Sequence, residues 1–114
     1  MQLHFKGQNL FLAPAVIERI ERRMRIALSR FADRIDRVTV RLADLNGPRS
    51  GVDKQCRIVV RLRSGGEIVI EDSASDFETA IDRGADRVQR AVARALARIR
   101  AAEDRPIFVP TTDQ

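Results

Sequence analysis

Cysteine, histidine and the two polar aromatic residues are scarce or absent in this chain of 114 residues. Its single cysteine, Cys56, excludes an internal disulfide framework and a cysteine-rich zinc module. Its single histidine, His4, excludes metal sites built from several histidines and catalytic triads that need a second one. Tryptophan and tyrosine are absent, which argues against a platform that stacks the bases of single-stranded nucleic acid.

Long apolar runs are missing as well. No stretch approaches the roughly 18 apolar residues that predict a membrane-spanning helix. The N-terminal residues alternate between polar and apolar side chains, and they lack the basic start and apolar middle of a signal peptide. We therefore expect a cytoplasmic protein without a membrane partner. Its length fits one domain, which can bury a core without disulfides.

Arginine is abundant and unevenly placed. The chain has 21 lysine and arginine residues against 16 aspartate and glutamate residues, and every basic residue except Lys6 and Lys54 is arginine. Residues 37–63 carry seven basic and two acidic side chains, and residues 83–100 carry six and one. Residues 67–82 carry six acidic side chains and no basic one. A GC-rich genome explains part of the arginine content, but the separate basic blocks point to a polyanion, because guanidinium groups suit phosphate oxygens.

Alternation of apolar and polar side chains predicts four strands. They cover residues 2–6, 37–44, 54–63 and 67–71. Ser64–Gly66 is typical of a hairpin turn between the last two strands. Each predicted strand has one apolar face, as expected for a sheet that is covered on one side only.

Apolar residues at three- and four-residue spacing predict two helices, over residues 14–32 and 76–102. Ser75 followed by Glu78 indicates a capping box at the start of the second helix. Residues 103–114 show no periodicity, and we interpret them as a mobile tail beyond a single domain of residues 1–102.

The predicted order β-α-β-β-β-α gives an α+β fold of two layers, a four-stranded sheet with both helices packed on one face. If the first two strands are neighbours, the helix between them makes them parallel. Cys56 falls on the apolar face of its strand, so we interpret it as a buried thiol. Asp72 and Asp76 flank a helix N-terminus, where the helix dipole favours acidic residues. No catalytic constellation is left, and we expect no enzyme activity.

The second helix carries a stripe of arginines on one side, well away from its apolar residues. At ~100° per residue the stripe occupies about 80° of arc, and at ~1.5 Å per residue it is roughly 22 Å long. Its members are Arg83, Arg87, Arg90, Arg94 and Arg98. A solvated helix face usually mixes charges of both signs, whereas like charges in a row repel one another unless a polyanion meets them. We interpret the stripe as a phosphate-binding surface.

Two weaker basic features accompany the stripe. Arg19 and Arg23 lie on the first helix, where acidic residues are interspersed. Arg49 and Lys54 belong to a turn-rich loop whose backbone N–H groups could also grip phosphate oxygens. The loop lacks the Gly-Lys-Ser/Thr ending of a P-loop. From physical arguments alone, an ordinary connecting loop is the preferred interpretation of this segment.

Three features together resemble a known family. They are the predicted element order, the opening Met1–Leu3 with Gly7–Asn9, and Asp-Phe-Glu-Thr-Ala-Ile-Asp over residues 76–82. They look like the ribosome hibernation-promoting factors, also called ribosome-associated inhibitors or sigma-54 modulation proteins. The loop over residues 44–56 is similar to one in a short-form branch of that family. The resemblance covers about residues 1–100.

The resemblance implies a fold like that of a double-stranded-RNA-binding domain with an additional N-terminal strand. It also implies binding to the small ribosomal subunit through rRNA, in the channel used by mRNA and tRNA, which silences idle ribosomes. By position, the rRNA contacts would come from the arginine stripe, from Arg19 and Arg23, and from Arg49 and Lys54. The chain departs from the family pattern at Phe77, where tyrosine is more usual, which removes a hydroxyl contact.

The expected function is therefore that of a ribosome-associated translation inhibitor without enzyme activity. We expect no metal, no cofactor and no small-molecule substrate, and a monomer when the protein is off the ribosome. Long members of the family carry a C-terminal dimerisation domain, and we do not expect ribosome pairing through such a domain here. The alternatives are a general binder of structured or double-stranded RNA that acts off the ribosome, and an enzyme or protein-interaction module that uses the open sheet face.

Overall fold

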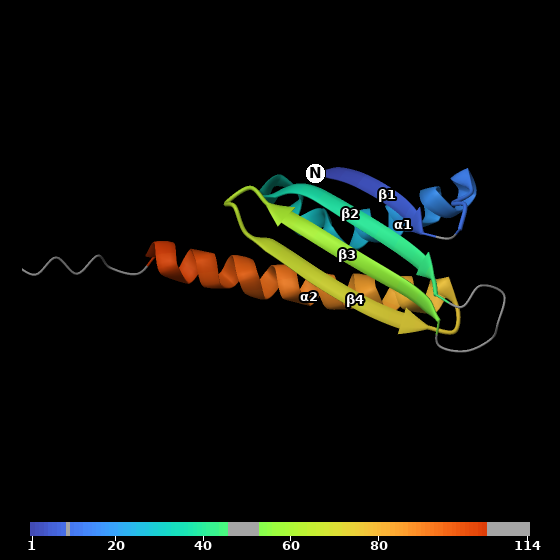
Figure 1. The fold of residues 1–114 in the computed structure, drawn as a ribbon. Coiled ribbons are helices and arrows are strands. Elements are labelled where there is room, and N and C mark those ends of the chain that lie inside the picture. Colours follow the sequence, from blue (N-terminus) through green and yellow to red (C-terminus); the bar gives the residue numbers. More distant parts are fainter. Residues whose placement is uncertain (9, 46–52, 105–114) are drawn as a thin grey trace, which may run out of the picture.

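The computed structural model of the chain describes residues 1–8, 10–45 and 53–104. Its secondary-structure elements follow in the order β1 (Gln2–Gln8), α1 (Pro14–Leu28), the 3₁₀ helix η1 (Ser29–Arg34), β2 (Ile35–Asp44), β3 (Lys54–Leu62), β4 (Glu67–Ala74) and α2 (Phe77–Asp104) (Figure 1). The predicted order β-α-β-β-β-α is confirmed, with a short 3₁₀ segment added after the first helix.

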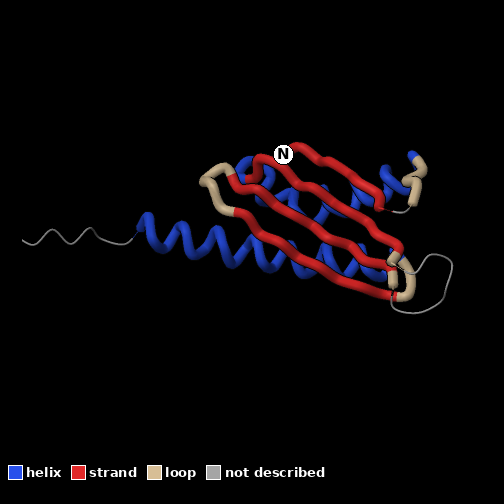
Figure 2. The backbone as a smooth tube through the Cα atoms, in the orientation of Figure 1, coloured by secondary structure: helices blue, strands red, loops and turns tan. Residues whose placement is uncertain are grey.

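The four strands form one sheet in the order β1-β2-β3-β4. β1 pairs with β2 in parallel, as predicted from the helical connection between them, and the other two pairs are antiparallel. Both helices lie on the same side of the sheet, so the molecule has two layers and the opposite sheet face is open (Figure 2). The predicted two-layer α+β fold is confirmed.

The register of the sheet sorts its side chains into a core face and an open face. Phe5, Val40, Ile58 and Ile70 stand opposite one another across the four strands. Val40 and Ile58 are fully buried, and Phe5 and Ile70 pack against the core cluster. The helices complete this core with apolar residues at helical spacing, among them Ile20, Met24, Leu28, Val88 and Val92. These contacts bury the apolar stripe of each helix against one face of the sheet.

Most elements begin and end within two residues of their predicted bounds, and the largest differences are at the ends of α1 and β4. α1 ends at Leu28 rather than at residue 32, and the chain continues as η1, because the last turns of a helix often tighten into a 3₁₀ helix. β4 extends to Ala74 rather than stopping at residue 71. The added residues pair with the start of β3, where Lys54 stands opposite Ala74.

The start of α2 is capped by a different residue from the one predicted. The Asp76 carboxylate accepts a hydrogen bond from the backbone N–H of Thr79 at 2.8 Å and another from the Thr79 hydroxyl at 3.0 Å. These bonds hold the pKa of Asp76 below its usual value. Asp76 is therefore the N-cap, and the capping box predicted for Ser75 and Glu78 is wrong. A carboxylate that accepts two bonds from one residue outcompetes the neighbouring hydroxyl.

A glycine in the N-terminal third of α2 lets the helix approach the sheet closely. A Cβ atom at Gly84 would lie 2.9 Å from the Ile58 Cδ1 atom and 3.7 Å from the Cys56 sulfur. Cys56 is fully buried beneath this contact, as predicted. Burial raises the pKa of its thiol to about 12. The thiol is therefore protonated at neutral pH and serves as part of the core.

α2 ends at Asp104, two residues beyond its predicted end, and its C-terminal part extends past the turn that joins β3 and β4 (Figure 1). Gly65 has a φ of 107° in that turn, which confirms the glycine hairpin predicted there. The rest of the predicted tail lies outside the described residues, as does the turn-rich segment 46–52. No helix among the described residues is long and apolar enough to cross a membrane.

Candidate nucleic-acid interface

The arginine stripe of α2 lies on an exposed side of the helix. All five of its arginines are solvent-exposed, whereas Ala85, Val88 and Val92 face the core. α2 has 28 residues, which corresponds to a length of about 42 Å. The helix therefore presents guanidinium groups along much of its length, as the spacing predicted.

The first two arginines of the stripe are already paired within the protein. Asp72, near the end of β4, lies 3.7 Å from the Arg83 guanidinium and 3.3 Å from that of Arg87. Arg83 also donates a hydrogen bond to the backbone carbonyl of Ser73, and Arg87 donates one to that of Glu71. The Asp72 side chain is only 13% exposed, so a partly buried carboxylate neutralises charge in this half of the stripe.

The last three arginines of the stripe have no such partner among the described residues. Arg90, Arg94 and Arg98 form no ion pair or hydrogen bond with any side chain in the part of the chain that the structure describes. They follow one another at four-residue spacing, so their side chains lie on neighbouring turns of one helix face. We name these three residues the unpaired stripe.

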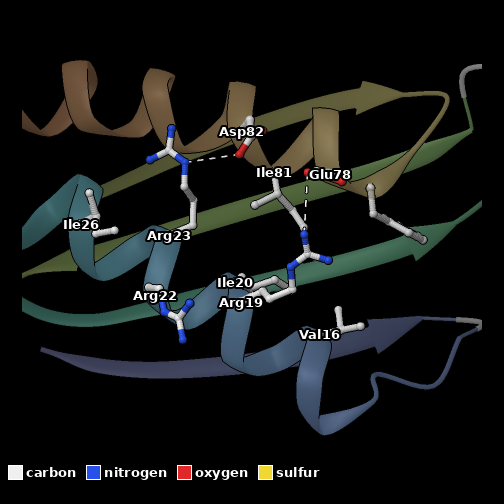
Figure 3. Close-up of a pocket in the computed structure, with 10 residues that line it drawn as sticks. Val16, Arg19, Ile20, Arg22, Arg23, Ile26, Glu78, Ile81 and Asp82 are labelled. Carbon is white, nitrogen blue, oxygen red and sulfur yellow. Dashed lines mark hydrogen bonds and ion pairs between the residues drawn. The ribbon is translucent and has the colours of Figure 1, made fainter.

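The candidate arginines of α1 face the acidic side of α2. Arg23 contacts Asp82 at 3.3 Å and Asp86 at 2.9 Å, and Arg19 lies 3.8 Å from Glu78. The Arg23–Asp82 and Arg19–Glu78 pairs cross a groove of about 420 Å³ between the helices (Figure 3). The structure therefore places both candidates beside α2, but with carboxylates at their guanidinium groups and away from the unpaired stripe.

The loop candidates have different outcomes. Arg49 lies outside the described residues. Lys54 begins β3, and its ammonium contacts Asp44 at 3.0 Å and Asp53 at 3.4 Å. Asp53 is the one buried charged residue of the described chain, with 1% of its surface exposed. The Asp44 carboxylate accepts a hydrogen bond from Lys54 and thereby raises the pKa of the lysine. This cluster ties the start of β3 to the end of β2.

Sequence reasoning missed Asp72 as a partner of the stripe. The signal was the connection between β4 and α2, which spans only Ser75 and Asp76. So short a connection forces the end of the strand to lie against the first turns of the helix. An acidic residue at that strand end is therefore close to Arg83 and Arg87, although the spacing within the helix gives no sign of it.

The open sheet face carries charges of both signs. Lys6, Arg41, Arg57 and Glu71 stand opposite one another across the four strands. Arg57 and Glu71 form an ion pair at 3.5 Å. The face is therefore basic on the first three strands and acidic along β4, unlike the single-sign surface of the unpaired stripe.

Comparison with known proteins places this arrangement in a family. The model of the family described as "Sigma 54 modulation protein / S30EA ribosomal protein" matches residues 3–100. The chain belongs to this family. The match includes both helices up to the end of the arginine stripe and all four strands. Among curated proteins, no sequence matches the chain.

Solved structures that are similar to this member of the S30EA family include the following two. The N-terminal domain of Protein Y from Thermus thermophilus is 28% identical, with a TM-score of 0.68, and the match covers 83% of this chain and 99% of that one. A ribosomal subunit interface protein from Coxiella burnetii has the same fold, with a TM-score of 0.69 at 18% identity, and the match covers 85% of this chain and 99% of that one. The family and fold expected from the sequence resemblance are thus confirmed.

Proposed function

We propose that this protein is a ribosome-associated translation inhibitor. It binds the small ribosomal subunit through rRNA and occupies the channel that mRNA and tRNA use, so that an idle ribosome cannot decode. The mechanism is steric occlusion held by contacts between arginines and phosphates. It requires no covalent chemistry, metal, cofactor or small-molecule substrate. The protein acts in the cytoplasm, as a monomer off the ribosome.

The unpaired stripe is the observation that carries this proposal. Like charges on successive helical turns repel one another, and the described residues supply no carboxylate to compensate Arg90, Arg94 and Arg98. A row of RNA phosphates would relieve this repulsion and release counterions from the RNA. Guanidinium groups also donate hydrogen bonds to phosphate in a fixed, forked geometry.

The family supports the ribosome as the source of that RNA. The description of the family to which the chain belongs includes the words "S30EA ribosomal protein". One of the solved structures with the same fold is that of a ribosomal subunit interface protein. Arg83 and Arg87 precede the unpaired stripe on the same helix face. They extend the contact surface when their ion pairs with Asp72 open or when they bind Asp72 and a phosphate together. We place Arg19, Arg23, Arg49 and Lys54 at the margin of the contact surface, with smaller contributions.

Sedimentation with purified ribosomal subunits tests the proposal. The protein should sediment with small subunits and not with large subunits. For about six phosphate contacts, its affinity should fall on the order of a thousandfold between 50 and 200 mM salt, by the estimate for duplex DNA. Absence of any binding to small subunits would contradict the proposed function.

Competition then tests the channel. Small subunits filled with mRNA and initiator tRNA should bind the protein much more weakly than empty subunits. Undiminished binding to filled subunits would refute occlusion even if the protein binds rRNA. Equal binding to subunits and to unrelated RNA duplexes would favour the alternative, a general binder of structured RNA that acts off the ribosome.

A further inference from the structure

A second hollow lies where η1 meets the C-terminal half of α2, away from the groove of Figure 3. It has a volume of about 490 Å³ and is lined by Arg30, Phe31, Asp33, Arg34, Ala93, Leu96, Ala97 and Arg100. We propose that this η1–α2 cleft is a binding site for phosphate groups of an RNA backbone. The inference rests on the proposed function, because it takes RNA as the ligand of the neighbouring unpaired stripe.

Charge is the first argument for the proposal. Three guanidinium groups, those of Arg30, Arg34 and Arg100, line the cleft with a single carboxylate, that of Asp33. Across the described residues, none of these three arginines has a carboxylate within ion-pair distance. The cleft therefore holds an excess of positive charge in a concave surface, where low-dielectric walls concentrate the field on an anion.

The shape of the cleft follows from the sequence of α2. In its N-terminal half, the side of α2 that faces α1 carries Asp82 and Asp86, which reach the arginine of α1. About two and three turns beyond Asp86, the same side carries Ala93 and Ala97. Alanine methyl groups do not fill the space between the helix and η1. The hollow opens at the point where acidic side chains give way to small ones.

On the η1 side of the cleft, the Arg30 side chain and the backbone at Arg34 are anchored. The Arg30 guanidinium lies over the Phe31 ring, 5.0 Å from its centroid, which restricts the side chain by a cation–π contact. The backbone carbonyl of Arg34 accepts a hydrogen bond from the backbone N–H of Arg63 at 3.0 Å, which ties η1 to the end of β3. Anchoring of this kind lowers the ordering cost that binding would otherwise carry.

The lining of the cleft favours RNA over an acidic peptide. Leu96 is buried beneath the cleft and Phe31 is partly buried, so the accessible surface is mainly guanidinium groups and methyl groups. A peptide partner usually needs a pocket for an apolar anchor. The cleft also adjoins the unpaired stripe, since Ala97 lies seven residues from Arg90 and nearly in line with it. One RNA strand can therefore contact both surfaces.

Two glutamate substitutions test the cleft with the same added charge. Ala97→Glu places a carboxylate among the three arginines, whereas Gln2→Glu adds one at an exposed position of β1, on the open sheet face opposite Arg37. We expect Ala97→Glu to weaken binding to small subunits roughly tenfold or more, and to lower the salt dependence by about two phosphate contacts. Gln2→Glu should bind almost as well as wild type. Equal affinities of the two variants would overturn the inference.

Arginine side-chain NMR separates this inference from the proposed function. The protein, labelled with ¹⁵N, is titrated with a short RNA duplex while the Nε–Hε resonances are followed. The resonances of Arg30, Arg34 and Arg100 should shift, while those of Arg37 and Arg41 on the open sheet face should not. If the wild-type protein binds subunits but these resonances do not shift, the cleft inference is contradicted and the proposed function is not. Cleft shifts with RNA but no subunit binding contradict the ribosomal function alone.

A variant that adds no carboxylate completes the test. Arg30→Gln with Arg100→Gln removes two of the three charges while keeping polar side chains, and circular dichroism must first show that it is folded. Its affinity for small subunits should fall at least as much as that of Ala97→Glu. Arg25→Gln, which removes an exposed arginine paired with Glu21, is the control. Shifts caused by an acidic peptide instead of RNA would identify a protein partner and overturn the proposal.

Discussion

The two halves of α2 carry the same residue type on the same face and differ in their surroundings. In the N-terminal half, Arg83 and Arg87 share the carboxylate of Asp72 and bond to backbone carbonyls of β4. In the C-terminal half, the unpaired stripe extends along a helix that runs past the end of the sheet (Figure 1). Spacing within a helix decides where a side chain points, but the neighbouring elements decide whether its charge is available.

Three of the five acidic residues of α2 reinforce this difference. Glu78, Asp82 and Asp86 lie in the first three turns and pair with Arg19 and Arg23 of α1, whereas the other two, Glu103 and Asp104, are the last residues of the helix. Acidic residues near a helix N-terminus are favoured by the helix dipole. Near the N-terminal turns of α2, Arg19 and Arg23 of α1 are therefore paired with carboxylates inside the protein. At the opposite end, the arginines of the unpaired stripe and of the η1–α2 cleft form no ion pair with a carboxylate among the described residues.

The largest expected effect comes from reversing charge in the unpaired stripe. Arg90→Glu with Arg94→Glu should weaken small-subunit binding roughly a hundredfold or more, because two phosphate contacts become repulsive. Both positions are exposed, so the fold should persist. Sedimentation and a salt titration measure the effect after circular dichroism has shown a folded protein.

A sheet variant controls for net charge. Arg37→Glu with Arg41→Glu makes the same change on two exposed residues of β2, and the new carboxylates would stand opposite Arg61 and Arg57. Opposite charges across strands stabilise a sheet, so this variant should fold. It should bind much better than the stripe variant. Equal losses from both would mean that the protein uses its charge diffusely and that the stripe is no specific site.

A smaller effect, of opposite sign, is expected when the paired half of α2 is released. Asp72→Asn keeps the shape of the side chain and can still accept the hydrogen bond that the Ser73 N–H donates at 2.9 Å. It removes the charge that neutralises Arg83 and Arg87. Affinity for small subunits should rise about threefold to tenfold, and the salt dependence should increase by roughly one phosphate contact. Unchanged binding would show that Asp72 does not limit these two arginines.

The sequence was sufficient to predict those features of the fold that follow from the periodicity of apolar and charged residues. Strict alternation located the strands, and the three- and four-residue spacing located both helices and the exposed side of the stripe. The error at the start of α2 has a simple cause, because Ser75 and Asp76 can both cap a helix and only the geometry chooses between them. The end of α1 was missed since apolar spacing continues to Phe31 after the α-helix has tightened into η1.

Contacts between distant elements could not be predicted in this way. Asp72 and Arg87 are separated by 15 residues, and Arg23 and Asp86 by 63. No local pattern reports such pairs, although they decide which arginines are available. The η1–α2 cleft is of the same kind, because its lining joins residues near 30 with residues near 100. The family resemblance agreed with the topology that the periodicity predicted, but it gave no account of the pairing.

The smallest effect on binding is expected from replacing Lys54, which contacts Asp44 and Asp53 at the start of β3. Lys54→Met should lower the thermal stability of the protein, because the nearly buried carboxylate of Asp53 loses the ammonium beside it. Folded Lys54→Met should still bind small subunits nearly as well as wild type. Lys6→Met, which removes an exposed lysine of β1, is the control and should change the melting temperature little.

The pH dependence gives this last prediction its sign. Folding raises the pKa of Lys54, chiefly through its hydrogen bond to Asp44. A raised pKa contributes stability that is complete below the pKa of the unfolded lysine, roughly 10.4, and that is lost as pH rises through the folded value. The difference in melting temperature between wild type and Lys54→Met should therefore be full at pH 7 and shrink in strongly alkaline buffer. A difference that grows with pH would contradict the ion-pair explanation, and a large loss of binding by the folded variant would place Lys54 on the RNA.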